Sequence, residues 1–166
     1  MTKPLLIATI GLPRSGKSSF VGQLSKLLGA PIVRKDAIRL ALHGMRYKLD
    51  AEPMIKTLAL YMIRSLFEAG HPIVIADETH YSKAAREVIK SDKWDVAFLV
   101  VPTPIEVCKE RALATEQPDL LPVIDEMAAR YEPPEGEDIL TYAYNTEAPV
   151  GEQLVGVWRN KKSLLT

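Results

Sequence analysis

A stretch near the start of the chain, Gly11 to Ser18, combines two glycines, a lysine and a hydroxyl side chain. Its spacing matches G-x-x-x-x-G-K-[ST], a pattern in which glycines let backbone N–H groups wrap around a polyphosphate. Residues 5–10 before it are apolar enough for a buried strand, and residues 18–28 after it have the apolar spacing of a helix. Strand, loop and helix in this order are the context that a phosphate-binding loop requires. The sequence therefore predicts a nucleotide-binding site.

The polar residues of this loop have distinct chemical uses. We expect Lys17 to reach the β- and γ-phosphates of ATP, and Ser18 to offer its hydroxyl to Mg²⁺. Arg14 stands where most such loops carry a small residue, and its side chain either contacts phosphate or points into water. The loop residues expected to contact the nucleotide are Gly11, Pro13, Arg14, Ser15, Gly16, Lys17, Ser18 and Ser19.

The rest of the chain alternates short apolar runs with amphipathic stretches. This alternation predicts an α/β fold, a five-stranded parallel sheet with helices on both faces in the style of P-loop nucleoside kinases. The expected strands are residues 5–10, 31–34, 71–77, 94–101 and 139–144. The expected helices are residues 18–28, 35–42, 52–69, 83–90, 104–114 and 122–131, with a last helix ending near residue 160. Residues 115–121 are expected to form a loop or a small mobile lid.

Two local expectations refine these helices. Thr103 and Glu106 have the spacing of a capping box, with proline at the first helical position between them. The helix at residues 52–69 carries apolar residues at 55, 58, 62 and 66, which predict its buried face.

Length and composition suit one soluble domain covering residues 1–166. A hydrophobic content of 47% and a charged content of 25% are ordinary for a globular protein. The sequence has no long apolar run and no basic-then-apolar start, so it predicts neither a membrane span nor a signal peptide. Its one cysteine, Cys108, excludes an internal disulfide and fits a reducing cytoplasm, where we expect the protein to work.

Charge is unevenly distributed along the chain. Residues 1–66 hold eleven Lys and Arg against three Asp and Glu, whereas residues 67–166 hold ten against eighteen. Part of the basic excess is expected to face ATP and an anionic acceptor, unless the two halves interleave in space. No basic-aromatic stripe marks an extended nucleic-acid surface, so a polynucleotide would be held near its reacting end.

Ligands of such sheets bind beyond the carboxyl ends of the strands, where this chain places Asp36 and Arg39. Their spacing of three puts both side chains on one helix face. An aspartate beside the γ-phosphate can accept the proton of an attacking hydroxyl, and an arginine can hold the acceptor or its phosphate. The alternative is that Asp36 only caps the helix and Arg39 is solvated.

Further polar residues follow the third expected strand. Asp77 at its end is similar to a Walker B carboxylate, which orders Mg²⁺ directly or through water. Glu78, Thr79 and His80 are expected to line the acceptor pocket, although Glu78 and His80 could equally serve plain turn chemistry. Arg86 either binds phosphate of the acceptor or is a surface charge of a helix.

Cations flank the expected lid. Arg111 is the first choice for a cation that closes onto the transferring phosphoryl group, with Lys109 and Arg130 nearby. Arg130 is the better candidate for a surface residue that pairs with nearby acids. Asn145 and Thr146, after the last strand, either hold adenine or form an ordinary loop.

Residues 11–18, 33–39 and 74–79, together with Arg86, resemble the 5′-kinase domain of phage polynucleotide kinase and its P-loop relatives, the small AAA-type and zeta-toxin-like kinases. Residues 123–134 look like the helix that follows the lid in that family. The resemblance implies ATP- and Mg²⁺-dependent transfer of the γ-phosphoryl to a hydroxyl. It also implies that Asp36 is the general base and that Arg39 serves the acceptor or the transition state.

The chain departs from the family at two places. The family's lid usually carries an arginine three or four residues after the position of Arg111, where this chain has Ala114 and Thr115. Either Arg111 or Arg14 takes over its role, or transfer is slow. The family usually has an asparagine where this chain has His80, which leaves the acceptor open.

The expected acceptor is a hydroxyl of a nucleic acid, either a 5′ end or a hydroxymethylated base in DNA. One alternative is a kinase for a small molecule such as a nucleotide-sugar, a sugar or an antibiotic. Another is a nucleotide-dependent switch that only hydrolyses ATP. The Asp36 and Arg39 pair argues against the switch, because a switch needs a residue that positions water rather than an acceptor base.

Overall fold

The computed structural model describes residues 3–47, 49–137 and 139–141. In chain order its elements are β1 (Leu5–Ile10), α1 (Lys17–Leu28), β2 (Ile32–Arg34), α2 (Lys35–His43), a 3-10 helix (Leu49–Ala51), α3 (Glu52–Glu68), β3 (Ile73–Asp77), α4 (Lys83–Glu87), β4 (Asp95–Val100), α5 (Ile105–Ala114), α6 (Leu120–Ala129) and β5 (Ile139–Thr141).

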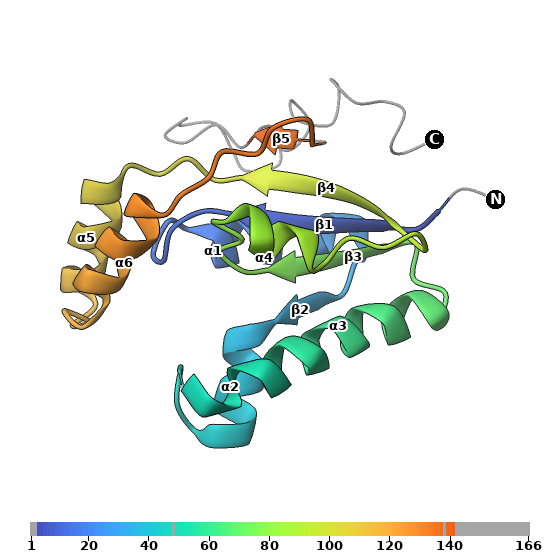
Figure 1. Ribbon diagram of the computed structural model, residues 1–166, viewed down its shortest axis with the longest axis horizontal. Helices are drawn as coiled ribbons and strands as arrows, with labels where there is room; N and C mark the ends of the chain where they lie inside the picture. Colours follow the sequence, from blue (N-terminus) through green and yellow to red (C-terminus); the bar gives the residue numbers. More distant parts are fainter. Residues whose placement is uncertain (1–2, 48, 138, 142–166) are drawn as a thin grey trace.

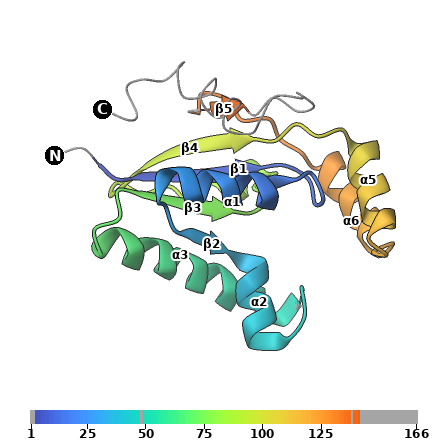
Figure 2. The same ribbon diagram turned by 180° about the vertical axis from the view of Figure 1, so that it is seen from behind.

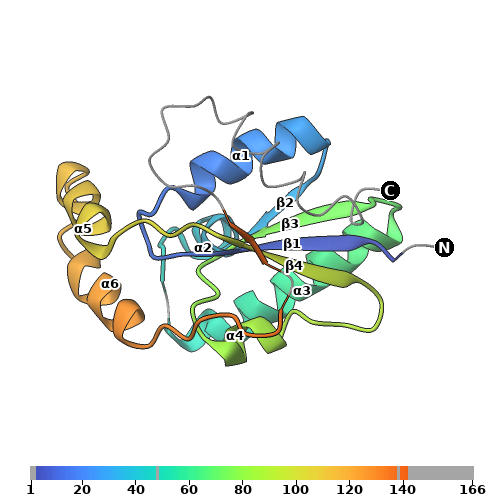
Figure 3. The ribbon, with the colours of Figure 1, turned by 90° about the horizontal axis from the view of Figure 1, so that it is seen from above.

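The five strands form one sheet in the order β2-β3-β1-β4-β5, and every neighbouring pair is parallel. Strand β1 is the central strand, and the phosphate loop follows its carboxyl end (Figure 1). Helix α1 covers one face of the sheet, and α3 and α4 cover the other (Figure 3). Helices α5 and α6 lie side by side beyond the carboxyl ends of the strands (Figure 2). The predicted five-stranded parallel sheet with helices on both faces is confirmed.

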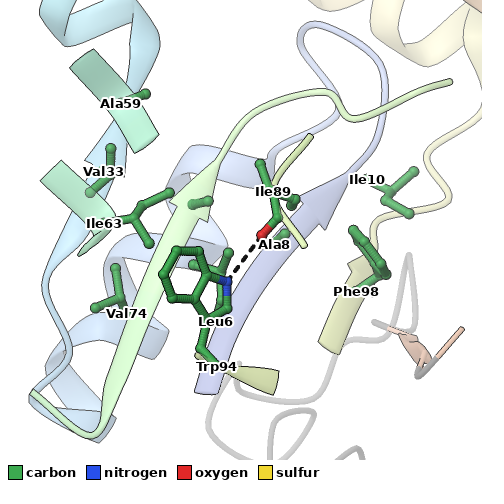
Figure 4. Packing of buried hydrophobic residues seen from close by; sticks show 11 residues of the cluster. Leu6, Ala8, Ile10, Val33, Ala59, Ile63, Val74, Ile89, Trp94 and Phe98 are labelled. Atoms are coloured by element: carbon green, nitrogen blue, oxygen red, sulfur yellow. Dashed lines mark hydrogen bonds between the residues drawn. The ribbon is translucent and has the colours of Figure 1, made fainter. Parts of the chain in front are cut away.

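The middle strand is buried along its whole length because both faces of the sheet are covered. Leu5 and Ile7 pack against α1. Leu6, Ala8 and Ile10 point to the opposite face and pack with residues of α3 (Figure 4). The continuous apolar run of this strand follows from these two contacts.

Trp94 closes the second of these faces. Its indole N–H donates a hydrogen bond to the carbonyl of Ile89 over 3.0 Å (Figure 4). Its ring lies 5.3 Å from that of Phe67. After Glu87 the N–H groups of Ile89 and Lys90 donate to the carbonyls three residues back, those of Arg86 and Glu87, instead of four residues back as in an α-helix. Helix α4 ends at Glu87, and the prediction that it extends to Lys90 is wrong.

Helix α3 buries a different stripe from the predicted one. The buried residues are Ile55, Ala59 and Ile63, which are spaced by four, whereas Met62 is 40% exposed. A stripe of i, i+4 residues matches the side chains that stack above one another on one helix face. The prediction is wrong at Met62, whereas Ile55 is buried and Leu58 and Leu66 are partly buried.

The predicted capping box is also wrong. Helix α5 begins at Ile105 after Pro104 and has no side-chain cap. The Thr103 hydroxyl instead donates to the backbone carbonyl of Ser15 over 2.7 Å. This hydrogen bond ties the segment before α5 to the phosphate loop.

The segment expected to be a lid is a short turn between α5 and α6. The Gln117 N–H donates to the carbonyl of Ala112 over 2.9 Å. Helix α6 starts two residues earlier than predicted, at Leu120. Its buried Ile124 packs against Cys108 and Ala112 of α5.

Strand β5 reaches Thr141, so the expected strand residues 142–144, the last helix, Asn145 and Thr146 lie outside the described residues. Within the described part of the chain, no helix is both long and apolar enough to cross a membrane.

Candidate active site

The loop between β1 and α1 has glycine at the positions that need it. Gly16 has φ of 95°, a left-handed conformation that L side chains rarely adopt. A Cβ on Gly11 would lie 2.9 Å from Ser15 Oγ and 3.0 Å from the Val101 carbonyl oxygen. The Ser15 carbonyl is held from outside the loop by Thr103. The loop is thus a narrow, preorganised cradle of backbone.

Lys17 is buried at the base of this cradle. Its ammonium donates to the Leu12 carbonyl over 2.6 Å and to Ser15 Oγ over 3.3 Å. Burial lowers the pKa of Lys17 to about 8, although the carboxylates of Asp77 and Asp36 act in the opposite direction. A polyphosphate in the loop would favour the charged form of this lysine.

Ser18 and Asp77 meet at the carboxyl end of β3. The Ser18 hydroxyl donates to Asp77 Oδ2 over 2.9 Å. Arg34 Nε donates to the same carboxylate oxygen over 2.7 Å from the neighbouring strand β2. A hydroxyl and a carboxylate are oxygen ligands that suit Mg²⁺, so this pair fits the metal expected beside a nucleotide.

Asp36 and Arg39 form the pair that their spacing predicts. Arg39 Nη1 donates to Asp36 Oδ1 over 2.6 Å. Glu52 of α3 accepts two further hydrogen bonds from Arg39, at 2.7 and 2.8 Å, and these raise the arginine pKa. The Asp36 side chain is 66% exposed and faces the cleft. The guanidinium is therefore fixed between two carboxylates, while Asp36 stays accessible.

A second charged pair links α2 to the turn after β3. Lys35 Nζ lies 2.6 Å from Glu78 Oε2. The Glu78 backbone is anchored by Thr9, whose hydroxyl accepts from the Glu78 N–H over 3.0 Å. His80 in the same turn is buried, with Nδ1 2.8 Å from the Thr9 carbonyl oxygen.

Two arginines lie on the phosphate loop. Arg111 Nη1 of α5 donates to the Arg14 carbonyl over 3.3 Å and lies beside Gly16. Arg14 itself has φ of 63°, and both side chains line the cleft. The structure thus brings the two candidate replacements for the absent lid arginine to one place.

Arg86 is not placed to bind an acceptor. It is 1% exposed, and its guanidinium donates to Glu137 Oε2 over 2.9 Å and to the His80 carbonyl over 3.1 Å. Both interpretations of Arg86, as a phosphate ligand and as a surface charge, are wrong. The reason is packing: the segment after α6 folds back over α4 and covers Arg86, and Glu132 N donates there to the Tyr81 carbonyl.

The remaining cations of the α5–α6 pair are engaged elsewhere. Lys109 lies 2.6 Å from Asp125 and does not line the cleft. Arg130 lines its edge and pairs with Glu126 over 3.1 Å, as expected for a surface residue.

A single cleft of about 1550 Å³ joins these groups. Among the described residues, its walls carry nine Lys and Arg side chains against six Asp and Glu. The predicted site residues in its walls are Pro13, Arg14, Ser15, Gly16, Lys17, Ser18, Ser19, Asp36, Arg39, Asp77, Thr79, His80 and Arg111. Gly11 lies behind the loop and shapes it.

Among the charged residues of the cleft that sequence reasoning missed, three pair with predicted residues: Arg34 with Asp77, Lys35 with Glu78, and Glu52 with Arg39. Arg34 and Lys35 immediately precede Asp36 at the end of a short strand, and that position was a usable signal. Glu52 stands 13 residues from Arg39, and only the α2–α3 packing brings the two together.

A parallel sheet with a glycine-bounded loop, a buried loop lysine and a Ser–Asp pair at the next strand defines a P-loop nucleotide-binding protein. Residues 6–134 match the sequence model of the AAA domain family, so the chain belongs to that family. No curated protein sequence matches the chain.

Several solved structures share this fold. A gluconokinase from Sinorhizobium meliloti 1021 has a TM-score of 0.62 and 20% identity, covering 99% of this chain and 98% of the other. The APS kinase CysC of Mycobacterium tuberculosis, in complex with AMPPNP and APS, has a TM-score of 0.67 and 18% identity, covering 99% of both chains. A chain of the Pnkp1/Rnl/Hen1 complex has a TM-score of 0.61 and 24% identity, covering 67% of this chain and 40% of the other. The chain thus has the P-loop kinase fold.

Proposed function

We propose that this protein is an ATP- and Mg²⁺-dependent phosphotransferase that moves the γ-phosphoryl group to a hydroxyl of an anionic acceptor. The observation that carries the proposal is the Asp36–Arg39–Glu52 arrangement in the wall of the cleft that also holds the phosphate loop. A protein that only bound nucleotide would have no need of a fixed aspartate–arginine pair opposite the loop.

The nucleotide half of the reaction uses the loop. Its backbone N–H groups and Lys17 would neutralise the phosphates, and Ser18 with Asp77 would hold Mg²⁺, which draws charge from the β- and γ-phosphate oxygens when bound. Arg111, next to Gly16, is placed to stabilise charge on the transferring group.

The acceptor half uses α2. Asp36 would take the proton of the attacking hydroxyl through its accessible carboxylate, and Arg39 keeps the other carboxylate oxygen in place. Because Glu52 already supplies a bidentate partner, Arg39 is oriented before substrate arrives. Such catalysis is mainly positioning and electrostatics.

The charge of the cleft supports an anionic acceptor. Arg46 and Lys56 line its α2–α3 side, and neither forms an ion pair with a described residue. These two cations, which are among the nine Lys and Arg side chains of the walls, would attract phosphate or carboxylate groups.

Two kinds of acceptor carry such charge. The sequence motifs resemble a polynucleotide kinase, which supports a nucleic-acid hydroxyl. Two of the similar structures are named as kinases of small molecules, gluconokinase and APS kinase, which supports a small anionic alcohol.

Transfer of labelled γ-phosphate tests the proposal. The panel contains 5′-hydroxyl DNA and RNA, hydroxymethylated DNA, nucleosides, D-gluconate, ribose 5-phosphate, glycerol 3-phosphate and glycerol. We expect label on at least one anionic acceptor and none on glycerol. ATP hydrolysis without any labelled product across the panel would instead support the nucleotide-dependent switch.

A further inference from the structure

His80 is a buried polar side chain that the proposed reaction does not use. It is 2% exposed, has φ of 40° and belongs to the turn after β3 that lines the cleft. Its Nε2 has no hydrogen-bond partner among the described residues. Buried polar atoms are nearly always paired, so this nitrogen calls for an explanation.

The hydrogen bond on the other side of the ring fixes its chemistry. Nδ1 lies 2.8 Å from the carbonyl oxygen of Thr9. A carbonyl oxygen only accepts, so Nδ1 carries the hydrogen. Burial lowers the pKa of His80, which keeps the ring neutral at pH 7. Nε2 therefore presents a lone pair, and it can only accept a hydrogen bond.

The carboxylate of Glu78 beside Nε2 cannot supply that hydrogen. Glu78 Oε2 lies 3.7 Å from His80 Nε2, and a carboxylate is also only an acceptor. The ammonium of Lys35 lies 2.6 Å from this same oxygen, and Nε2 has no hydrogen bond from it or from another described residue. Two acceptors thus lie side by side in the turn that lines the cleft.

The charges around the two acceptors select the kind of donor. Lys35 already compensates the Glu78 carboxylate, so an ammonium group on a ligand would meet a like charge. An anionic group would face two lone-pair acceptors. A neutral hydroxyl has neither penalty and can donate to Nε2.

The position of this cluster places it on the acceptor side of the cleft. Lys35 is the chain neighbour of Asp36 and belongs to the same helix, α2. The Lys35–Glu78 pair therefore joins the turn holding His80 to the helix that carries the proposed base.

We propose that Nε2 of His80 accepts a hydrogen bond from a second hydroxyl of the acceptor, distinct from the hydroxyl that is phosphorylated. The acceptor class is then an anionic polyhydroxy compound rather than a DNA 5′ end, which has no second hydroxyl. This inference rests on the proposed function and names the substrate class of the same site.

The variant His80→Asn removes Nε2 with little other change. The asparagine amide can still donate to the Thr9 carbonyl from the δ position, and asparagine tolerates a left-handed backbone better than most residues. His71→Asn, made in the segment before β3, is the matched control. Thermal unfolding is expected to show both variants folded.

The first readout is the steady-state kinetics of phosphoryl transfer to whichever acceptor of the panel becomes labelled. We expect His80→Asn to raise the acceptor KM about 5- to 100-fold, the range for a donor left without its buried partner, with kcat and the KM for ATP within about threefold. An acceptor analogue lacking the second hydroxyl should bind the wild type about as weakly as it binds the His80→Asn variant. The loss of affinity from removing the hydroxyl and the loss from the substitution should therefore not add.

A second readout does not depend on turnover. In full-length protein with ¹⁵N-labelled histidine, the signal of the unprotonated His80 nitrogen should move upfield when D-gluconate or ribose 5-phosphate is added with AMPPNP and Mg²⁺. The same additions should leave the His71 signals in place.

The outcomes separate the two proposals. A labelled acceptor whose KM is unchanged in His80→Asn, or an Nε2 signal that none of the polyols moves, overturns the role of His80 and leaves a buried water as the partner of Nε2. A polyol that moves the Nε2 signal while nothing in the panel is phosphorylated supports the binding role and overturns the proposed transfer. Label confined to 5′-hydroxyl DNA overturns the polyhydroxy class and leaves the kinase proposal standing.

Discussion

The hydroxyl of Ser18 donates a hydrogen bond to the carboxylate of Asp77 over 2.9 Å, although 59 residues separate them in the chain. The contact joins the first turn of α1 to the carboxyl end of β3. It brings a loop hydroxyl and a strand carboxylate together one residue from the buried Lys17. The position of this pair follows from the sheet order, because β1 and β3 are neighbours.

The Arg34 guanidinium shares the Asp77 oxygen that Ser18 contacts, so it competes with a cation at that place. We expect Arg34→Gln to lower the Mg²⁺ concentration that gives half-maximal transfer by about threefold or more, because one bound positive charge is removed. A magnesium titration of the transfer activity measures this half-maximal concentration. Arg64→Gln, which removes an exposed pair with Glu68, is the control. A half-maximal Mg²⁺ concentration that stays the same or rises in Arg34→Gln argues against competition between Arg34 and Mg²⁺ at Asp77.

Lys17→Met should abolish transfer and yet stabilise the protein at pH 7. The lysine pKa is about 8 in the folded chain against an ordinary value of 10.5, so burying the charge costs about 3 kcal/mol. The unfolded chain binds more protons between these two values, and wild-type stability therefore rises from pH 8 to pH 10.5. Urea unfolding at pH 7 and pH 10 checks this. The advantage of the variant should shrink at the higher pH, and a variant less stable than wild type at pH 7 would refute the expectation.

Gly11→Ala should weaken nucleotide binding and stability. The new Cβ would lie 3.0 Å from the Val101 carbonyl, a backbone atom that cannot move aside without shifting β4. We expect a destabilisation of about 1–3 kcal/mol. Gly22→Ala is the matched control, since a Cβ there meets nothing within 4 Å and alanine favours the helix by about 1 kcal/mol. Thermal unfolding with and without ATP compares them; equal behaviour of the two variants would show that the loop has room for a methyl group.

Arg86→Met should destabilise the fold without directly removing a ligand of the acceptor. The substitution leaves Glu137 without its buried arginine and the His80 carbonyl without its donor, which costs about 3 kcal/mol. Chemical denaturation measures the loss, and Arg64→Met, on the surface, should leave stability nearly unchanged. A stable Arg86→Met variant with a raised acceptor KM would restore the role in acceptor binding.

The sequence was sufficient for the sheet and for the centre of the site, because their signals are local. The phosphate loop with its flanking strand and helix, the Asp36–Arg39 spacing and the apolar run that ends at Asp77 are each readable within a few residues. All three lie around one cleft in the structure. Parallel strands have their carboxyl ends at the same edge of the sheet, so the predicted parallel sheet implied that these residues would meet.

What the sequence did not reveal depends on contacts between distant residues. Thr103 has the sequence pattern of a helix cap, but its hydroxyl donates a hydrogen bond to the Ser15 carbonyl of the phosphate loop. Arg86 has the look of a surface charge until the segment that contains Glu137 folds over it. The unpaired nitrogen of His80 is visible only once the Thr9 carbonyl is seen to hold the opposite side of the ring.

The central claim is that Asp36 accepts the proton of a hydroxyl during phosphoryl transfer. The most direct measurement is transfer of labelled γ-phosphate by wild type and Asp36→Asn, with ATP affinity measured in parallel. Asparagine keeps the size of the side chain and a hydrogen-bond acceptor for Arg39 but is not a base, so we expect a rate loss of about 10²- to 10⁴-fold with ATP affinity within about threefold. An Asp36→Asn enzyme that turns over at the wild-type rate would contradict the account.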